Sequence, residues 1–424
     1  MNSIIVHEYE KINEDKLKEV IPNYNGEFEQ LVQFIEETVS TDEIEDAYRF
    51  MTVGKNREHG RYVSFKNYVG LVQLKSGLQI EILPKINLLD DNKTKEVFLK
   101  MLRSMKEFEG MPFNMSNLNV DHMNLYEVFI NLYLQETSKL IKYGLKSSYV
   151  SEEDNLNFFK GKLIVKQQLK QNLVHKEKFY VSYDEYSLNT SENKLIKSTL
   201  LRLHNLSENS NNKKLCRQLL SHFELVNESL NYDDDFSKVV SNRNNRDYDT
   251  LMKWSKVFLK NKSFTTFSGN SISRALLFPM EKIFESYVAK IIKRNFGDEW
   301  NVTTQDNGYF LFDEPRKFKL KPDIVISRND FTKIIMDTKW KILDISKENY
   351  GISQADMYQM YAYAKKYKTP NIWLLYPMNG EVNNHIRISF ESRDDEGNKE
   401  AIVNLFFVDI SNVESSINEL KEFL

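Results

Sequence analysis

Two short apolar runs, each joined to an acid, constrain the fold of this chain more than any other feature. The first run begins directly after Asp323, and the second ends directly before Asp337, fourteen residues along from the first acid. Residues 327–330 between the runs are turn-forming, so we expect the two runs to pair as a β-hairpin. Side chains alternate between the faces of a strand, so Asp337 and Lys339 should point the same way. The hairpin would bring two carboxylates and an ammonium group together.

That combination of groups suits metal-dependent cleavage of a phosphodiester bond. Carboxylate oxygens are the ligands that Mg²⁺ prefers, and a nearby ammonium group can stabilise charge or position an attacking water molecule. Pro322-Asp323 followed by Asp337-Thr338-Lys339 resembles the core of the PD…(D/E)xK nucleases. The alternative is a solvated sheet face, on which an acid and a lysine two positions apart are common, and short motifs give false matches.

A helix expected over residues 278–292 offers a third acid. Pro279 suits a helix start, and apolar residues follow it at helical spacing. Glu281 and Glu285 lie four positions apart and share a face of this helix. We expect Glu281 to be a surface acid. Glu285 directly follows a core residue, and nucleases of this class often supply one more acid from a helix packed on the sheet, so it is the better candidate. The buried stripe is expected to comprise Met280, Ile283, Phe284, Tyr287, Val288 and Ile291.

A second helix, downstream of the hairpin, carries Gln359 and Tyr363. These residues are one helical turn apart, so both can face the same site. Gln-x-x-x-Tyr after an Asp-x-Lys strand resembles the RecB-type branch of these nucleases, in which this helix shapes the active site and its DNA contacts. Helix packing would explain such a pair if it stood alone, but here the order of helices and strands is also right. The next apolar run, residues 371–377, is expected to be a central strand covered on both faces.

Charge and composition describe an ordinary folded chain with a near-neutral balance. The 424 residues are enough for two or three domains, and 58 Lys and Arg stand against 61 Asp and Glu, a net charge of −3. A nuclease that holds long DNA by itself usually carries excess positive charge, so the near-neutral balance indicates that a partner holds much of the DNA. The alternative, and commoner, explanation of the local basic clusters is a solvated lysine-rich face. Those clusters are Arg316, Lys317, Lys319 and Lys321, and Lys160, Lys162, Lys166 and Lys170.

Several classes of protein are disfavoured by what the sequence lacks. The single cysteine, Cys216, excludes an intramolecular disulfide and favours a reducing compartment. There is no apolar run of membrane-spanning length, and the N-terminus lacks the features of a signal peptide, so we expect a cytoplasmic protein with no membrane contact. No glycine-rich loop ends in Gly-Lys-Ser/Thr, so the chain is not expected to bind nucleotide through a P-loop.

The pattern of elements predicts an α/β fold class in three parts. Residues 1–150 are expected to form a mixed α+β domain, 151–270 a mostly helical middle region, and 271–424 a restriction-endonuclease-like α/β domain. Expected strands in the first part are 4–6, 61–65, 68–74 and 78–86, with a hairpin turn at Ser76-Gly77, and expected helices are 29–38, 94–107 and 124–143 with Gly144 at its end. The polar runs 207–214 and 232–235 are expected to be loops.

Most of the chain also resembles the McrC family, the nuclease subunit of McrBC-type restriction systems. The N-terminal resemblance lies in Tyr-Val-Gly-Leu at 68–71, Ile-Glu-Ile-Leu-Pro-Lys-Ile at 80–86 and the helix end at 142–145. It continues through 161–163, 183–187, 192–194, 278–280 and 284–285 into the nuclease motifs. Trp340 stands where a smaller aromatic residue is expected, and the middle-region loops are long for the family.

The resemblance implies a division of labour with a partner. McrC-type proteins act with a separate AAA+ ring that binds and hydrolyses GTP, recognises modified cytosine in double-stranded DNA and translocates that DNA. This chain would dock on the ring through its N-terminal region, stimulate GTP hydrolysis and cleave with Mg²⁺, and we also expect it to self-associate during double-strand cleavage. A polar loop expected at 54–61 could reach the partner's pore with Arg57 or Arg61, although an ordinary exposed turn explains it equally well.

Three hypotheses about function follow from the sequence. The leading one is the endonuclease subunit of a GTP-driven restriction complex directed to modified cytosine. The second is a RecB-like repair or processing nuclease that acts without a GTPase, and the McrC-like first eighty residues argue against it. The third is a non-catalytic adaptor that activates a partner. The intact set Asp323, Asp337 and Lys339 argues against the adaptor, which would not need it.

Overall fold

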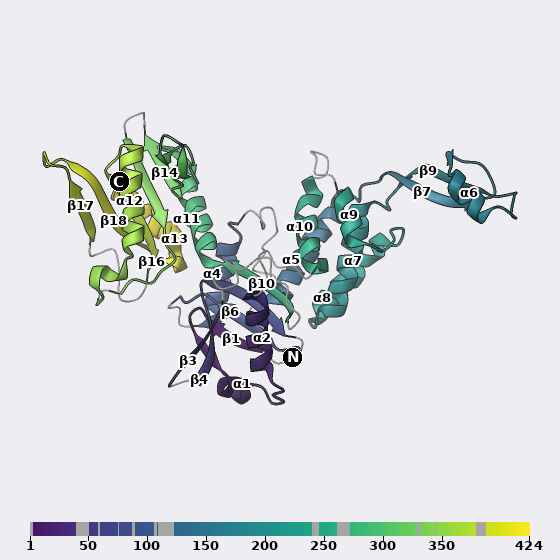
Figure 1. Cartoon of the computed structure of the whole chain (residues 1–424), viewed down its shortest axis with the longest axis horizontal. Helices are drawn as coiled ribbons and strands as arrows, with labels where there is room; N and C mark the ends of the chain where they lie inside the picture. Colours follow the sequence, from purple (N-terminus) through teal and green to yellow (C-terminus); the bar gives the residue numbers. More distant parts are fainter. Residues whose placement is uncertain are drawn as a thin grey trace. The chain divides into compact units, whose positions relative to one another are not determined.

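The chain folds into two compact units, shown in the computed structural model of Figure 1. One unit is Met1–Glu109 together with Phe264–Leu424, and the other is Gly110–Ser263. The structure describes residues 3–39, 51–57, 60–74, 76–86, 90–105, 108, 123–239, 246–260, 272–328, 332–344, 346–378 and 387–424. Its mixture of helices with parallel and antiparallel strands confirms the α/β fold class. The division into three domains stays a prediction.

A four-stranded sheet organises the N-terminal part of the first unit, in the order β1-β6-β5-β10. It contains β1 (Ser3–His7), β5 (Tyr68–Leu74), β6 (Gln79–Leu83) and β10 (Ile272–Pro279). Every residue of β5 and β6 is buried, and Gly77, with φ 90°, makes the predicted turn between them. β10 pairs with β5 from about two hundred residues away, so the chain returns to the N-terminal sheet immediately before its C-terminal part.

A smaller sheet, in the order β2-β4-β3, corrects the expectation of a loop at 54–61. It contains β2 (Lys11–Asn13), β3 (Met51–Asn56) and β4 (Gly60–Phe65), and β3 and β4 pair from Met51↔Phe65 to Asn56↔Gly60. Most of the expected loop is therefore strand, and residues 58–59 lie outside the described part of the chain. Arg61 is held by Glu29 at 3.1 Å and by Glu36 at 3.2 Å.

Three helices of this part are α1 (Glu14–Val20), α2 (Glu27–Val39) and α4 (Asp91–Leu102). The helix expected over 29–38 is confirmed as α2. The helix expected over 94–107 begins earlier, because Asp90 caps it by accepting from the backbone N–H of Asn92, and it ends at Leu102. Residues 106 and 107 lie outside the described residues. No helix in the described part of the chain is both long and apolar enough to cross a membrane.

The second unit is a helical bundle that carries a small sheet. Its helices are α5 (Leu125–Tyr143), α6 (Val165–Gln171), α7 (Ser191–Leu206), α8 (Ser210–Leu220), α9 (Tyr232–Lys238) and α10 (Arg246–Lys260). The predicted helix at 124–143 is confirmed as α5, with Asn124 as its N-cap and Gly144, at φ 91°, as its C-cap. The sheet of β7 (Ser148–Leu156), β8 (Lys162–Leu163) and β9 (Phe179–Ser187), in the order β7-β9-β8, was not expected in a mostly helical region.

The two polar runs expected to be loops are helix starts instead. Asn209 accepts from the backbone N–H groups of Asn211 and Asn212 and so caps α8. Asn231 caps α9 in the same way, by accepting from Asp233 and Asp234. Asparagine is a favoured N-cap, and the acids in the first turn of α9 complement its helix dipole, so the polar residues mark the beginnings of helices.

A six-stranded sheet forms the C-terminal part of the first unit, in the order β11-β14-β15-β16-β18-β17. The strands are β11 (Asn301–Thr304), β14 (Ile324–Arg328), β15 (Thr332–Thr338), β16 (Asn371–Pro377), β17 (Ser389–Arg393) and β18 (Lys399–Val408). β16 runs parallel to both of its neighbours, whereas β11, β14 and β17 pair antiparallel. The predicted central strand at 371–377 is confirmed.

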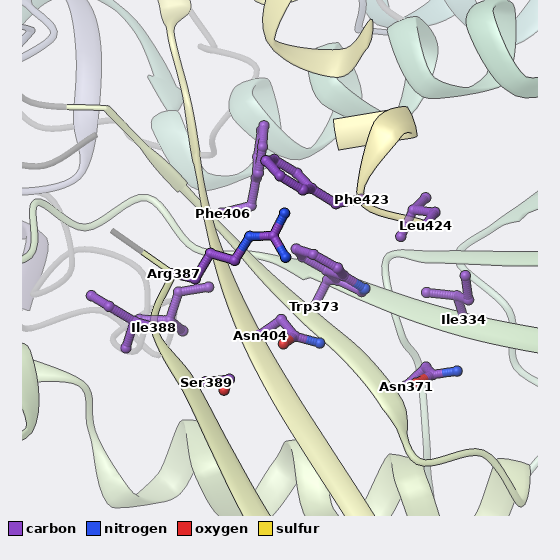
Figure 2. Close-up of a pocket in the computed structure, with 11 residues that line it drawn as sticks. Ile334, Asn371, Trp373, Arg387, Ile388, Ser389, Asn404, Phe406, Phe423 and Leu424 are labelled. Carbon is purple, nitrogen blue, oxygen red and sulfur yellow. The ribbon is translucent and has the colours of Figure 1, made fainter. Parts of the chain in front are cut away.

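Three helices pack against this sheet: α11 (Met280–Phe296), α12 (Gln354–Tyr367) and α13 (Val413–Glu422). α12 joins the core cluster that contains Ile372, Leu374 and Tyr376 of β16. Trp373, which alternates with these residues along β16, stacks its ring on that of Phe423, the residue after α13 (Figure 2). All six residues of the stripe predicted for α11 are buried. A separate hairpin of β12 (Phe310–Phe312) and β13 (Lys317–Lys319) lies in sequence between β11 and β14.

Candidate active site

The predicted β-hairpin is confirmed as β14 and β15, which pair antiparallel from Ile324↔Met336 to Arg328↔Thr332. Asp323 and Asp337 each lie one position beyond the Ile324↔Met336 pair, so both acids lie at the same end of the hairpin, away from its tip. The backbone N–H and the hydroxyl of Thr338 each donate to Asp323 Oδ2 at 2.7 Å. Asp323 is thereby fixed to the strand that carries Asp337. Residues 329–331, at the tip of the hairpin, lie outside the described residues.

Asp337 and Lys339 form an ion pair at this end of the hairpin. Asp337 is only 2% exposed, and Lys339 Nζ lies 2.7 Å from its Oδ2 atom. The backbone N–H of Lys339 donates to Leu375 O at 2.9 Å, which holds the residue after β15 against β16. Lys339 Nζ also lies 3.7 Å from Asp356 Oδ1. Asp337 and Lys339 therefore meet as their spacing on an extended chain predicts.

Glu285 reaches the same region from α11, through a residue that the sequence did not single out. Gln305 Nε2 donates to Glu285 Oε1 and lies 3.4 Å from Asp323 Oδ1. The backbone N–H of Gln305 donates to Asp323 O at 2.8 Å, and its φ of 54° lies in the left-handed region. Gln305 belongs to no motif, and its place directly after β11, the strand beside β14, is the one signal that could have identified it. Glu281 is exposed, as expected of a surface acid.

α12 supplies the remaining two predicted residues. Gln359 Oε1 accepts from Lys339 Nζ at 3.1 Å, and Gln359 Nε2 donates to the Tyr363 hydroxyl at 2.7 Å. Ser353 caps this helix by accepting from the backbone N–H of Asp356, which sets where its first turn begins. The contacts thus form two sets: one contains Lys339, Gln359 and Tyr363, and the other contains Glu285, Gln305 and Asp323. Thr338, the residue before Lys339, donates to Asp323 of the second set.

The electrostatics of the site are those of crowded acids, of which Asp337 is buried and Glu285 and Asp323 are partly buried. Burial raises the pKa of Asp337 to about 7, and the charge of Asp323 adds to the effect. Burial and Asp323 likewise raise the pKa of Glu285 to about 7. Burial also raises the pKa of Asp323, against the hydrogen bonds from Thr338, which lower it. Burial alone would lower the pKa of Lys339, but the charge and hydrogen bond of Asp337, together with the charges of Asp356 and Asp323, outweigh it and the pKa is raised. A cation placed among these acids would relieve their repulsion.

The chemistry of Glu285, Asp323 and Asp337 suits a divalent metal ion, because all three are hard oxygen donors. Within the described residues, no three acidic, histidine or cysteine side chains are already arranged as a metal-holding group. The carboxylate oxygens are instead bound by donors of the chain itself. Gln305 Nε2 bridges Glu285 and Asp323, and Lys339 Nζ forms an ion pair with Asp337. The three carboxylates are ligands of the type that Mg²⁺ prefers, and the side chains of Gln305 and Lys339 would have to move away from them for an ion to bind.

Known proteins resemble this chain in sequence and in fold. A family described as "McrBC 5-methylcytosine restriction system component" matches residues 63–377. No curated protein sequence matches the chain. The fold resembles that of a chain in a refined half-complex from a tetradecameric assembly of Thermococcus gammatolerans McrB AAA+ hexamers with bound McrC. That match has a TM-score of 0.69 and 17% identity and covers 100% of both chains.

A second solved structure is that of the Thermococcus gammatolerans McrBC complex, with a TM-score of 0.47 and 18% identity over 69% of this chain and 88% of that chain. At 17% identity, the similarity between this chain and the matched chain of the half-complex shows a shared fold and nothing more. The family match is what decides membership, because it spans most of the sequence and includes the β14–β15 hairpin. The resemblance first seen in the N-terminal and nuclease motifs is confirmed: the chain belongs to the family of McrBC 5-methylcytosine restriction system components.

Proposed function

We propose that this chain is the DNA-cleaving subunit of a GTP-dependent restriction complex directed to modified cytosine. The observation that carries the proposal is the buried cluster at the end of β14 and β15. There, Asp323 and Asp337 lie together and Lys339 forms an ion pair with Asp337 at 2.7 Å. An adaptor without chemistry would have no reason to crowd a buried and a partly buried acid together so that the pKa values of both are raised.

In this proposal Glu285, Asp323 and Asp337 hold Mg²⁺, which when bound supplies a Lewis acid for the scissile phosphodiester. Lys339 places its ammonium group where negative charge develops or where an attacking water molecule must be oriented. Gln359 positions Lys339 by accepting a hydrogen bond from its ammonium group at 3.1 Å, and Gln359 is in turn fixed by the bond that it donates to the Tyr363 hydroxyl at 2.7 Å. Lys339 is thus held by α12 as well as by Asp337, which limits its freedom before substrate binds.

The partner in the proposal is an AAA+ GTPase ring. The similar Thermococcus gammatolerans structure is described as McrB AAA+ hexamers with bound McrC, and this chain matches one of its chains over their full lengths. The sequence has no glycine-rich phosphate loop of its own, so GTP binding, recognition of modified cytosine and translocation of double-stranded DNA are assigned to the ring. Docking is assigned to residues 1–150 and cleavage to residues 271–424, with 151–270 between them.

Reconstitution tests the proposal directly. The chain, its AAA+ partner, GTP and Mg²⁺ should together cleave DNA that carries 5-methylcytosine, whereas the chain alone should bind DNA weakly and cut it little. Matched reactions omit one component at a time or use unmodified DNA. Vigorous GTP-independent cutting of unmodified DNA by the chain alone would point to a RecB-like repair nuclease. Stimulated GTP hydrolysis with no cutting under any condition would point to an adaptor.

A further inference from the structure

The hairpin at residues 309–321, here called the rim hairpin, is a surface that the proposed chemistry does not use. It contains β12 and β13, which pair as Phe310↔Lys319 and Phe312↔Lys317. Every residue from 311 to 319 is exposed, so the hairpin contributes little to the core beyond its base. Its sequence nonetheless carries aromatic residues together with four basic ones, a composition that burial within the chain does not explain.

Two phenylalanines at the exposed end of the rim hairpin are poorly placed for stability. Phe312 is 56% exposed and Phe318 is 69% exposed, and their rings meet edge to face at 5.8 Å. Phe318 also has a φ of 59°, in the left-handed region that a bulky side chain rarely adopts. Strained residues of this kind cluster at functional sites, where the surrounding structure holds them in place. An exposed aromatic pair on a strained backbone is typical of a binding surface.

The charge of the rim hairpin is opposite in sign to that of the whole chain. It carries Arg316, Lys317, Lys319 and Lys321 against two acids, whereas the chain has a net charge of −3. One of those acids, Asp313, is already paired with Lys366 of α12 at 2.8 Å. Over the described ranges, Arg316, Lys317 and Lys319 make no ion pair within the chain. Their charges are available to an anionic partner.

The base of the rim hairpin is anchored beside the candidate active site. Leu320 belongs to the core cluster of the six-stranded sheet, and its backbone N–H donates to Tyr309 O at 2.9 Å. The ring of Tyr309 lies 4.3 Å from that of Tyr367 on α12, the helix that carries Gln359 and Tyr363. The hairpin runs directly into Asp323, only two residues after Lys321. A polymer bound at the acids would therefore pass close to the hairpin.

We propose that the rim hairpin grips double-stranded DNA next to the scissile bond. In this arrangement Arg316, Lys317 and Lys319 contact phosphates, and the Phe312–Phe318 pair enters a groove as an apolar wedge against the bases. The choice of DNA as the partner rests on the proposed function. The exposed aromatic pair, the strained backbone and the unpaired charges indicate a binding partner of some kind whether or not the proposed function is correct.

The test measures binding of the full chain to a fluorescent DNA duplex in EDTA, so no cleavage is needed. Lys317→Ala/Lys319→Ala should weaken binding about fivefold or more and flatten the salt dependence, since each lost phosphate contact reduces the log–log slope by about 0.9. Phe312→Ser should weaken binding by a similar factor with the slope unchanged. Phe318→Asn, which tolerates the left-handed backbone, should act like Phe312→Ser.

Matched controls are Lys93→Ala/Lys100→Ala, two exposed lysines of α4, and Tyr143→Ser, an exposed aromatic residue of the other unit. Losses no larger than those of the controls, or no measurable duplex binding by the unmodified chain at low salt, would overturn the proposal. Variants that bind DNA normally but fail to bind the AAA+ partner would overturn it too, and would assign the hairpin to protein docking. If the unmodified chain never cleaves but the variants lose DNA binding, the proposed function fails and the hairpin's role stands.

Discussion

At the scale of single residues, the contrast between Glu281 and Glu285 shows how position gives one acid a role and leaves another on the surface. Both lie on α11, one helical turn apart. Glu281 is exposed and accepts from Asn67 Nδ2 at 2.8 Å. Glu285 is partly buried, is held by Gln305, and has its pKa raised to about 7 by burial and by Asp323. Spacing along the helix made both acids candidates, and the sequence favoured Glu285 through its place after Phe284.

This pair gives a matched test of the third acid. Glu285→Ala should lower cleavage by about a hundredfold, as expected for loss of a group that stabilises charge in the reaction, whereas Glu281→Ala should leave it within twofold. Gln359→Ala should cost less, about tenfold, because this residue positions Lys339 rather than binding the metal. Cleavage rates are compared once circular dichroism shows that each variant is folded. Wild-type cutting by folded Glu285→Ala would make this residue a helix-surface acid like its neighbour.

Trp340 shows a residue that the family pattern left unexplained and the structure accounts for. Its indole N–H lies 3.2 Å from Glu8 Oε1 and 3.0 Å from Oε2, and its ring packs 5.3 Å from that of Phe284. A smaller aromatic residue lacking this N–H would leave Glu8, which is 1% exposed, with the backbone N–H of Lys85, at 3.1 Å, as its one donor among the described residues. Because Glu8 is 332 residues away in sequence, no local pattern could reveal this contact.

The burial of Glu8 predicts a dependence of stability on pH. Burial raises the pKa of Glu8 from 4.5 to about 7, so the folded chain retains a proton that the unfolded chain releases. The stabilisation is fully present below pH 4.5 and is lost as pH rises to about 7, a change on the order of 1–3 kcal/mol in the free energy of unfolding. Denaturant melts across this range should show a steeper decline for the wild type than for Glu8→Gln, which cannot titrate. Parallel curves would contradict the assignment.

At the scale of elements, the sequence was most informative where a local rule decides the structure. Alternation and turn residues predicted the β14–β15 hairpin, and helical spacing predicted α5 and α11 with their buried faces. The rules failed where polar residues had a second use, as at Asn209 and Asn231, which cap helices instead of forming loops. Gln305 was missed because its role depends on two acids from other elements, and spacing along one strand carries no sign of them.

At the scale of the whole molecule, the return of β10 to the N-terminal sheet limits how the chain can be divided. β10 pairs with β5 from Ile272↔Leu74 to Pro279↔Tyr68, and α11 begins at the next residue. A fragment ending near residue 260 would lack one strand of the four-stranded sheet and expose the fully buried β5. Docking and cleavage are therefore better separated by point substitutions in the full chain than by truncation.

The most direct measurement of the central claim is cleavage of methylated DNA by Asp337→Ala protein with the AAA+ partner, GTP and Mg²⁺. Asp395→Ala, which removes an exposed acid, is the matched control. Cleavage by Asp337→Ala, and equally by Asp323→Ala, should fall on the order of a thousandfold, and Lys339→Ala should be severely impaired. GTP turnover by the partner should remain stimulated by the variants as by the wild type. Cleavage by folded Asp337→Ala at the wild-type rate would contradict the proposed active site.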